Sequence, residues 1–470
     1  MSHDTSLLLL TLVAVVGLVI LTAHFKLNAF IALLLASLFV GVCSGVELPS
    51  IGKAIVDGVG SVLGSIAVIV GLGTILGKML AESGGAEIVA TTFMRLLGEK
   101  RVHWTMMLIG FVVGIAVWFS VGLVLLIPIA FTIAKKSKVS LLLPGIPMVA
   151  GLSVMHGLVP PHPGPMAAIG VLGADAGKTI LYSLIIGLPV AVIAGPIFGK
   201  FIARHVPVEL GGIGAQMGEQ RIASGSSPGF GLTLFTILLP VLLMLLATMV
   251  DVGLDALHRQ QSLASERGDV WIFKLMGGLS GIRPWTAFLG TPAVAMLIAV
   301  LFSFYSFGFA RGFTRQQLAK FSEESLAPVA TVLLVVGAGG GFSKVLDVCG
   351  VGKAIAGVTE GLHLSPLLFG WFVAALIRVA VGSATVAITT AAGILAPIAS
   401  ATPGTSPELL VIAMGAGSVV LSHLNDGGFW FVKEYFNLTV PQTLKTWTVM
   451  ETIISVAALI LTLLLSILIK

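Results

Sequence analysis

The chain has 470 residues, of which 57% are hydrophobic and only 10% are charged, and its mean hydropathy is +1.08. These values exclude an ordinary soluble domain and indicate an integral membrane protein. The formal net charge of +5 does not indicate nucleic acid as a partner, because membrane proteins collect lysine and arginine in their cytoplasmic loops. Composition therefore predicts membrane lipid as the surroundings of this chain.

Apolar segments follow one another along almost the whole chain, and many have the roughly 18 or more residues that a helix needs to cross a membrane. In the first half we expect them at 6–23, 28–46, 58–81, 104–134, 141–173 and 179–199. In the second half we expect them at 230–250, 287–309, 325–346, 366–398, 407–437 and 446–469. The two series match in order, and a polar stretch at 204–229, rich in glycine and serine, is the expected connecting loop.

The two halves also resemble each other in sequence. GLGTILGKMLAESGGA, which begins at Gly71, aligns with GAGGGFSKVLDVCGVG in the second half, and His156 falls opposite His423 after small changes in offset. Similar segments in the same order indicate an internal repeat, which in transporters brackets a site near the middle of the membrane. We therefore predict two repeats, residues 1–203 and 230–470.

Segments 104–134 and 366–398 are each too long for one comfortable crossing and too short for two. Each is best interpreted as a re-entrant hairpin, which returns to its own side of the membrane. About ten transmembrane helices then remain, with an odd number in each half, so the second repeat starts from the opposite face and the repeats are inverted. Lysine and arginine support this arrangement, because with both termini periplasmic the KKSK cluster at 135–138 is cytoplasmic.

Two segments carry residues that interrupt a helix. MHGLVPPHPGP at 155–165 contains four prolines, which remove amide donors, so 141–173 is predicted to be a broken helix. SHLNDGGFW at 422–430 is the predicted break within 407–437. Irregular backbone at membrane depth is tolerated where protein or a water-filled cavity satisfies it. We expect the two breaks to meet at one cavity for a small hydrophilic solute, because the free amides of half-helix N-termini favour an anion.

Ionisable side chains at these depths indicate function, since placing them in a membrane costs free energy. His156 and His162 are expected either to bind the solute or to cap the carbonyl groups of the broken helix. Asp426 is the first candidate for proton coupling, and holding the helix break is its alternative role. For Arg378 we weigh two roles equally, a clamp on a substrate carboxylate and a structural partner of Asp426.

Four stretches of the chain stand out as motifs: VGLVLLIPIAFTIAKK at 121–136, HGLVPPHPGP at 156–165, VGSATVAITTAA at 381–392 and SHLNDGGFWFVKEYFNLT at 422–439. They closely resemble the gluconate permease family of bacterial proton symporters, and the resemblance covers nearly the full chain. It implies a multi-pass homodimer of the bacterial inner membrane that takes up gluconate or a related sugar acid with protons. It also implies the all-α, polytopic, inverted-repeat fold of the ion transporter superfamily, with no cofactor, metal or catalytic residue.

In that superfamily the hairpin tips and the helix breaks that follow them hold the substrate. The resemblance therefore assigns substrate binding to these residues of the chain: Ser120, Val121, Gly122, His156, His162, Gly164, Ser383, Thr385, His423 and Asn425. The chain departs from the family's pattern at Ser120, where several relatives carry Glu or Asp. Proton coupling then falls on Asp426 or on a histidine such as His156, or the proton stoichiometry differs.

Other functions have less support. A D-serine permease or another small organic-anion permease of the same fold is the alternative, and an anion channel is a more distant one. The chain has no GxxxxGK[ST] sequence, so we do not expect it to hydrolyse ATP itself, and it has no HExxH pair for a metallopeptidase. We therefore expect a carrier and not an enzyme.

Overall fold

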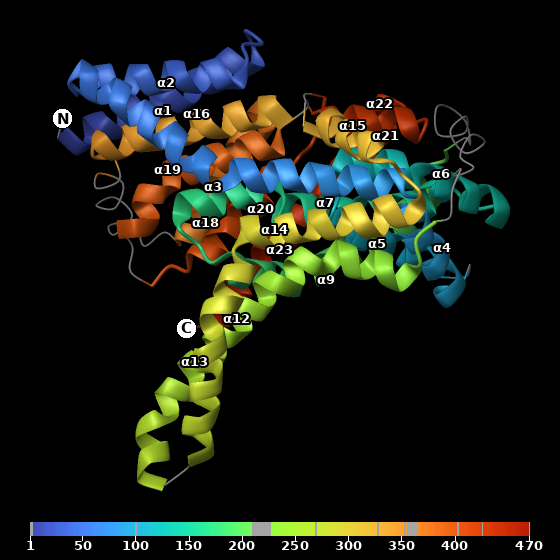
Figure 1. The fold of residues 1–470 in the computed structure, drawn as a ribbon. Helices are drawn as coiled ribbons and strands as arrows, with labels where there is room; N and C mark the ends of the chain where they lie inside the picture. Colours follow the sequence, from blue (N-terminus) through green and yellow to red (C-terminus); the bar gives the residue numbers. More distant parts are fainter. Residues whose placement is uncertain are drawn as a thin grey trace.

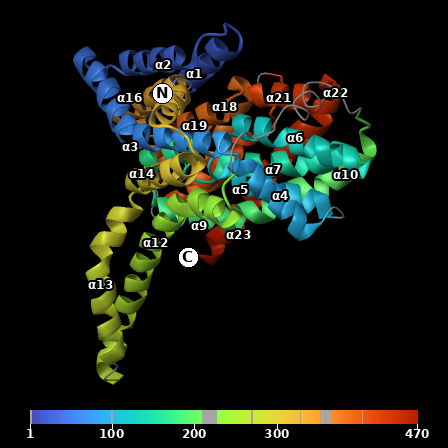
Figure 2. The ribbon, with the colours of Figure 1, turned by 45° about the vertical axis from the view of Figure 1, so that its right-hand side comes forward.

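The structure is a computed structural model that describes residues 3–98, 101–208, 227–267, 270–326, 329–351, 354, 365–401, 404–424 and 426–469. Within these ranges every regular element is a helix, so the predicted all-α class is confirmed. Most helices lie in one body, and the hairpin of α12 (Phe230–Arg267) and α13 (Val270–Gly290) projects from it in both ribbon views (Figure 1, Figure 2). Most of the predicted connecting loop lies outside the described residues.

The body is built from helices of both halves of the chain. The helices of the first half are α1 (His3–Ala23), α2 (Ala29–Cys43), α3 (Leu48–Glu82), α4 (Gly85–Leu97), α5 (Val102–Gly114), α6 (Phe119–Ser137), α7 (Leu142–Leu158), α8 (Pro163–Leu172), α9 (Ala176–Val192), η2 (Ile193–Ile197) and α10 (Phe198–His205). Those that follow α13 are α14 (Pro292–Ser303), η3 (Phe304–Gly308), η4 (Phe309–Arg311), α15 (Arg315–Leu326), α16 (Val329–Val348), α18 (Pro366–Val381), α19 (Ala384–Ala401), α20 (Pro407–Val419), α21 (Gly427–Tyr435), α22 (Val440–Thr443), η5 (Leu444–Thr448) and α23 (Val449–Leu468).

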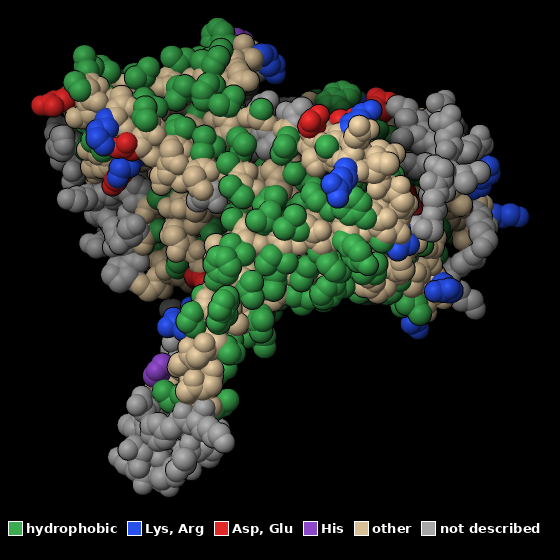
Figure 3. Space-filling model, viewed as in Figure 1, with side chains coloured by type: hydrophobic (Ala, Val, Ile, Leu, Met, Phe, Trp, Pro, Cys, Tyr) green, Lys and Arg blue, Asp and Glu red, His purple; other side chains and the backbone are tan. Residues whose placement is uncertain are grey.

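The helices have the length and composition of membrane spans. In the described part of the chain, six helical stretches are long and apolar enough to cross a membrane, and shorter apolar helices accompany them. Figure 3 shows hydrophobic side chains over the middle of the visible face of the body, with charged side chains mostly toward its ends. The chain is therefore a multi-pass membrane protein. The number of crossings, about ten, stays a prediction.

The two segments expected to be hairpins each form a pair of packed helices, α5 with α6 and α18 with α19. α5 has 13 residues and is therefore about 20 Å long, shorter than the roughly 30 Å of the hydrocarbon core. Gly382 and Ser383 form the turn between α18 and α19, and Gly382 has a φ of 80°, a left-handed conformation that glycine adopts at little cost. Such short pairs suit re-entrant hairpins, and re-entry and inversion themselves stay predictions.

Both expected breaks interrupt a helix. Residues 159–162 separate α7 from α8, and α8 begins at Pro163, a position where the missing amide hydrogen is tolerated. Residues 420–426 separate α20 from α21. In this second break the indole of Trp430 donates a hydrogen bond of 2.9 Å to the carbonyl oxygen of Leu424. Partners of this kind replace water where irregular backbone lies inside a membrane protein.

Glycine lets α7 approach its neighbour α5 closely. A Cβ added to Gly151 would lie 2.5 Å from the carbonyl oxygen of Met107 and 2.6 Å from the backbone nitrogen of Phe111. Membrane helices use small residues at their interfaces in this way. Since α7 is buried along nearly its whole length, this contact fixes the helix that carries Ser153 and His156.

Gly151→Ala should lower the apparent melting temperature of the detergent-solubilised protein by several degrees. The new methyl group would force α5 and α7 apart, and overpacking of this kind costs about 1–3 kcal/mol. Gly60→Ala in α3 is the matched control, because nothing lies within 4 Å of a Cβ placed there. Thermal unfolding monitored by size-exclusion chromatography compares the two variants, and equal melting temperatures would contradict the tight contact.

Candidate functional site

A cavity of about 360 Å³ lies where both helix pairs, both interrupted segments and α23 contribute side chains. Its polar lining consists of Ser120, Ser153, His156, Arg378, Ser383, Thr385, Asp426 and Glu451. Aromatic side chains complete the wall: Trp118, Phe119, Phe431 and Trp447. Its volume falls in the range of small-molecule sites, about 300–1,000 Å³. Polar groups beside aromatic rings suit a small, hydrophilic ligand.

Three helices begin at this cavity. α6 starts at Phe119, α19 at Ala384 and α21 at Gly427, and each of these residues lines the cavity. The first amides of a helix have no partners within the helix, and the helix dipole places partial positive charge there. Three N-termini at one cavity therefore favour an anion in it.

Arg378 is the buried cation of the cavity wall, with 3% of its side chain exposed. Its Nη2 lies 2.5 Å from Oδ2 of Asp426, and its Nη1 donates to the carbonyl oxygen of Gly382. Its Nε has no hydrogen-bond partner among the described residues. The guanidinium thus links the turn between α18 and α19 to the break before α21.

Asp426 receives hydrogen bonds from several donors besides Arg378. The hydroxyl of Ser422 donates to its Oδ2, and the amide of Gly428 donates to its Oδ1 at 2.9 Å, so Asp426 caps α21. The indole of Trp447 in turn donates to the Ser422 hydroxyl oxygen at 2.6 Å. Arg378 therefore has Asp426 as a structural partner, which is one of the two roles expected for it.

His156 lines the cavity from the last turn of α7. Its ring lies 5.4 Å from the ring of His162, centroid to centroid, with the planes at 75°. Nδ1 of His156 has no hydrogen-bond partner among the described residues, although it is buried. A polar nitrogen in this condition is available to a ligand in the cavity or to water.

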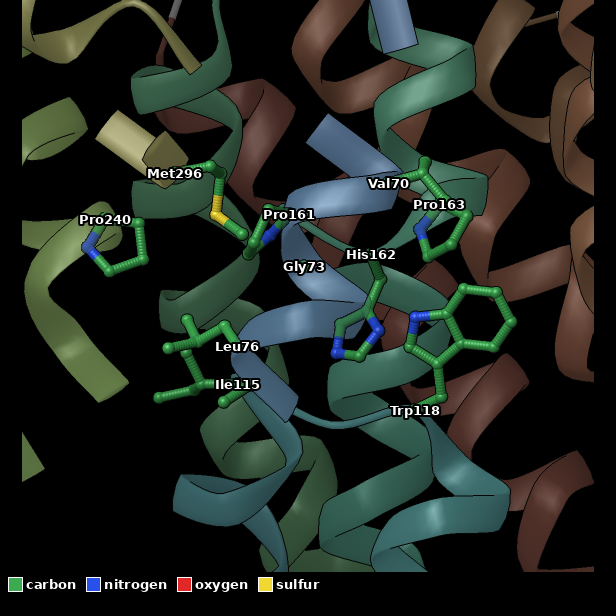
Figure 4. A pocket seen from close by; sticks show the side chains of 11 residues that line it. Val70, Gly73, Leu76, Ile115, Trp118, Pro161, His162, Pro163, Pro240 and Met296 are labelled. Carbon is green, nitrogen blue, oxygen red and sulfur yellow. The ribbon is translucent and has the colours of Figure 1, made fainter. Parts of the chain in front are cut away.

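His162 lies elsewhere, in a small second cavity of about 20 Å³ beside Trp118, Pro161 and Pro163 (Figure 4). Its Nε2 lies 2.5 Å from the carbonyl oxygen of Gly114, the last residue of α5. The tautomer with its proton on Nε2 donates a hydrogen bond there and satisfies a carbonyl group that no helical amide reaches. His162 is thus in position to cap a helix end, and it does not line the larger cavity.

The larger cavity brings together only part of the set predicted to bind substrate. The members of that set that line it are Ser120, His156, Ser383 and Thr385. Val121 and Gly122 belong to the first turn of α6 but do not line the cavity. The tip of the first helix pair therefore reaches the cavity through one residue of the three that the resemblance assigns.

Gly164 and His423 also lie outside the lining of the larger cavity. Gly164 packs against α19, where an added Cβ would lie 2.8 Å from the Ile388 side chain. His423 lies in the break before α21, and its carbonyl oxygen accepts the amide of Asp426 at 2.9 Å. Asn425 lies outside the described residues.

Two polar residues of the cavity escaped the sequence-based prediction. Glu451 is 1% exposed and lines the cavity from α23. The sequence did carry a signal for it, because it is the only charged residue in the apolar run 446–469. Ser153 lies three residues before His156, a spacing that places both on one face of α7. A serine in a helix gives no comparable signal.

Comparison with known proteins gives consistent results. A family model described as GntP family permease matches residues 6–468. The chain is 48% identical to a gluconate permease of Pseudomonas aeruginosa over 99% of both chains, and 46% identical to a gluconate permease of Zymomonas mobilis over 98% of both. The crystal structure of the Alcanivorax borkumensis YdaH transporter is similar to 89% of this chain over 87% of its own, with a TM-score of 0.54 and 16% identity. This last likeness shows that the two chains share a fold.

Removing Arg378 alone should destabilise the protein more than removing both charges of its ion pair. Arg378→Met leaves Asp426 without its cation, and breaking a buried pair from one side costs about 3–5 kcal/mol. The double variant Arg378→Met/Asp426→Asn should recover much of the lost melting temperature in detergent. A double variant no more stable than Arg378→Met would contradict this account of the pair.

Proposed function

Since this chain belongs to the GntP family of permeases, and is therefore a multi-pass membrane transporter, we propose that it takes up gluconate or a closely related sugar acid by proton-coupled secondary active transport. The membrane is the bacterial inner membrane, with both termini on the periplasmic side, and the working unit is a homodimer. The names of the similar permeases support the substrate class.

The observation that carries the substrate proposal is the presence of three helix N-termini and Arg378 at one cavity. We place the substrate carboxylate beside Arg378, because its unpartnered Nε and the partial positive charge at the helix N-termini suit an anion. The hydroxyl groups of Ser120, Ser383 and Thr385 supply donors and acceptors for the polyol chain. A sugar acid combines these two requirements in one molecule.

Alternating access is supported by the origin of the cavity lining. The α5–α6 pair provides Ser120 and the α18–α19 pair provides Ser383, so both predicted repeats, 1–203 and 230–470, contribute to the cavity. Inverted repeats that rock against each other expose one site to each side of the membrane in turn. Asp426 and His156, which the sequence named as candidates for proton coupling, both line this cavity.

Transport by purified protein in lipid vesicles tests the proposal. With an acidic exterior, labelled gluconate should accumulate inside to a concentration above that outside, and the rate should saturate with substrate. An anion channel would only equilibrate gluconate. Competition by idonate, fructuronate, galactonate and D-serine identifies the substrate, and D-serine as the strongest competitor would favour the amino-acid alternative.

Ser120→Ala should raise the KM for gluconate by roughly 2- to 12-fold, because one lost hydrogen bond costs about 0.5–1.5 kcal/mol. The maximal rate should change little if the hydroxyl only binds substrate. Ser322→Ala in α15 is the matched control, since its hydroxyl bonds to Leu318 of its own helix, away from the cavity. An unchanged KM for Ser120→Ala in the vesicle assay would remove Ser120 from the substrate site.

A further inference from the structure

Glu451 is a buried carboxyl group to which the function described so far gives no role. It lies in the third position of α23, is 1% exposed, and lines the same cavity as Arg378 and Asp426. Its Oε1 has no hydrogen-bond partner among the described residues. An ionised carboxylate in such a place carries a high desolvation cost unless a paired cation or several donors compensate its charge.

The ionisable groups that face Glu451 come from three neighbouring elements. His156 lines the same cavity from α7, as do Arg378 from α18 and Asp426 from the break before α21. Ser153 on α7 is its hydrogen-bond neighbour. The other helices packed against α23, namely α9, α20, η2 and η5, contribute no ionisable side chain to this cavity.

Arg378 already bonds to residues other than Glu451. Its Nη2 pairs with Asp426 and its Nη1 bonds to the Gly382 carbonyl, and no ion pair joins it to Glu451 in the described residues. The two carboxyl groups of the cavity therefore differ in how many hydrogen-bond donors they have. Asp426 has an arginine, a hydroxyl and an amide as donors, whereas Oε1 of Glu451 has no donor in the part of the chain that the structure describes.

We propose that Glu451 carries the proton that accompanies the substrate, while Asp426 positions Arg378 and caps α21. This inference deepens the proposed function and rests on it. A proton from the outer water binds the Glu451 carboxylate and makes it neutral, and the same proton leaves to the inner water after the substrate is released. No bond other than the O–H bond forms or breaks.

Charge explains why the proton and the anion bind together. With Glu451 ionised, one arginine and two carboxylates leave the cavity with one excess negative charge, which opposes an anion. Protonation of Glu451 removes that excess, so the anion binds better to the protonated cavity. By thermodynamic linkage, the anion in turn strengthens proton binding by the same factor. Proton and sugar acid then cross as an electroneutral pair.

The first test is Glu451→Gln in lipid vesicles, since glutamine keeps the size of the side chain but cannot carry the proton. The wild-type protein should accumulate gluconate about tenfold per pH unit if one proton accompanies each anion. Glu451→Gln should lose this accumulation but keep gluconate exchange at equal pH. Glu323→Gln, an exposed acid on α15, is the matched control and should accumulate gluconate like the wild type. Accumulation by Glu451→Gln would overturn the proposal.

The second measurement is gluconate binding at different pH values, followed by the fluorescence of Trp118 and Trp447 in the cavity wall. Wild-type affinity should fall as the pH rises, and the affinity of Glu451→Gln should not depend on pH. An unchanged pH dependence in this variant would also overturn the proposal. If the wild type neither exchanges nor accumulates gluconate, the proposed function fails rather than the assignment of Glu451.

A third measurement needs no variant and remains decisive if Glu451→Gln does not fold or if gluconate is not the substrate. Dicyclohexylcarbodiimide reacts with protonated carboxyl groups in apolar surroundings. Peptide mass spectrometry of the wild-type protein treated at pH 6 should find the adduct on Glu451 and not on Asp426. An adduct on Asp426 alone, or on neither residue, would overturn the proposal.

Discussion

The guanidinium of Arg378 connects two irregular segments of the chain. It donates to the carbonyl of Gly382 in the turn between α18 and α19 and pairs with Asp426 in the break before α21. Inside a membrane protein water is not freely available to these groups, so a side chain must take its place. The shape of the cavity wall on this side depends on that bridge, because the turn and the N-terminus of α21 both line the cavity.

The ion pair of Arg378 and Asp426 also explains how the cavity can bind an anion weakly enough to release it. Asp426 neutralises Arg378, so the pair as a whole adds no net charge to the cavity. In the proposed mechanism the attraction for a carboxylate then comes mainly from the partial charges at the starts of α6 and α19, because Asp426 already caps α21. A carrier must release what it binds, and partial charges that the ligand shares with water allow this more readily than an unpaired arginine would.

Much of this arrangement could be predicted from the sequence, and the exceptions have physical reasons. The break between α7 and α8 could be predicted, because the prolines in this stretch cannot continue the regular helix of α7. The direction of the His162 ring could not be predicted, since its partner is the carbonyl of Gly114 in another helix. The helix α13 was not predicted from the sequence. Hydropathy identifies segments that are buried in lipid, and it does not identify helices that contain polar residues, such as the end of α12.

Two different kinds of element carry the proposed substrate-binding and proton-binding residues of the cavity. Ser120 lines the cavity from the first turn of α6, while Glu451 lines the same cavity from α23. An acid on a hairpin tip would move with the tip, whereas α23 continues without interruption to Leu468 and packs against α7, α9 and α20. In the proposed mechanism the proton therefore stays on a continuous helix while the two repeats rock against each other. Coupling under this arrangement needs no direct contact between the proton and the sugar acid, because the charge of one cavity is common to both.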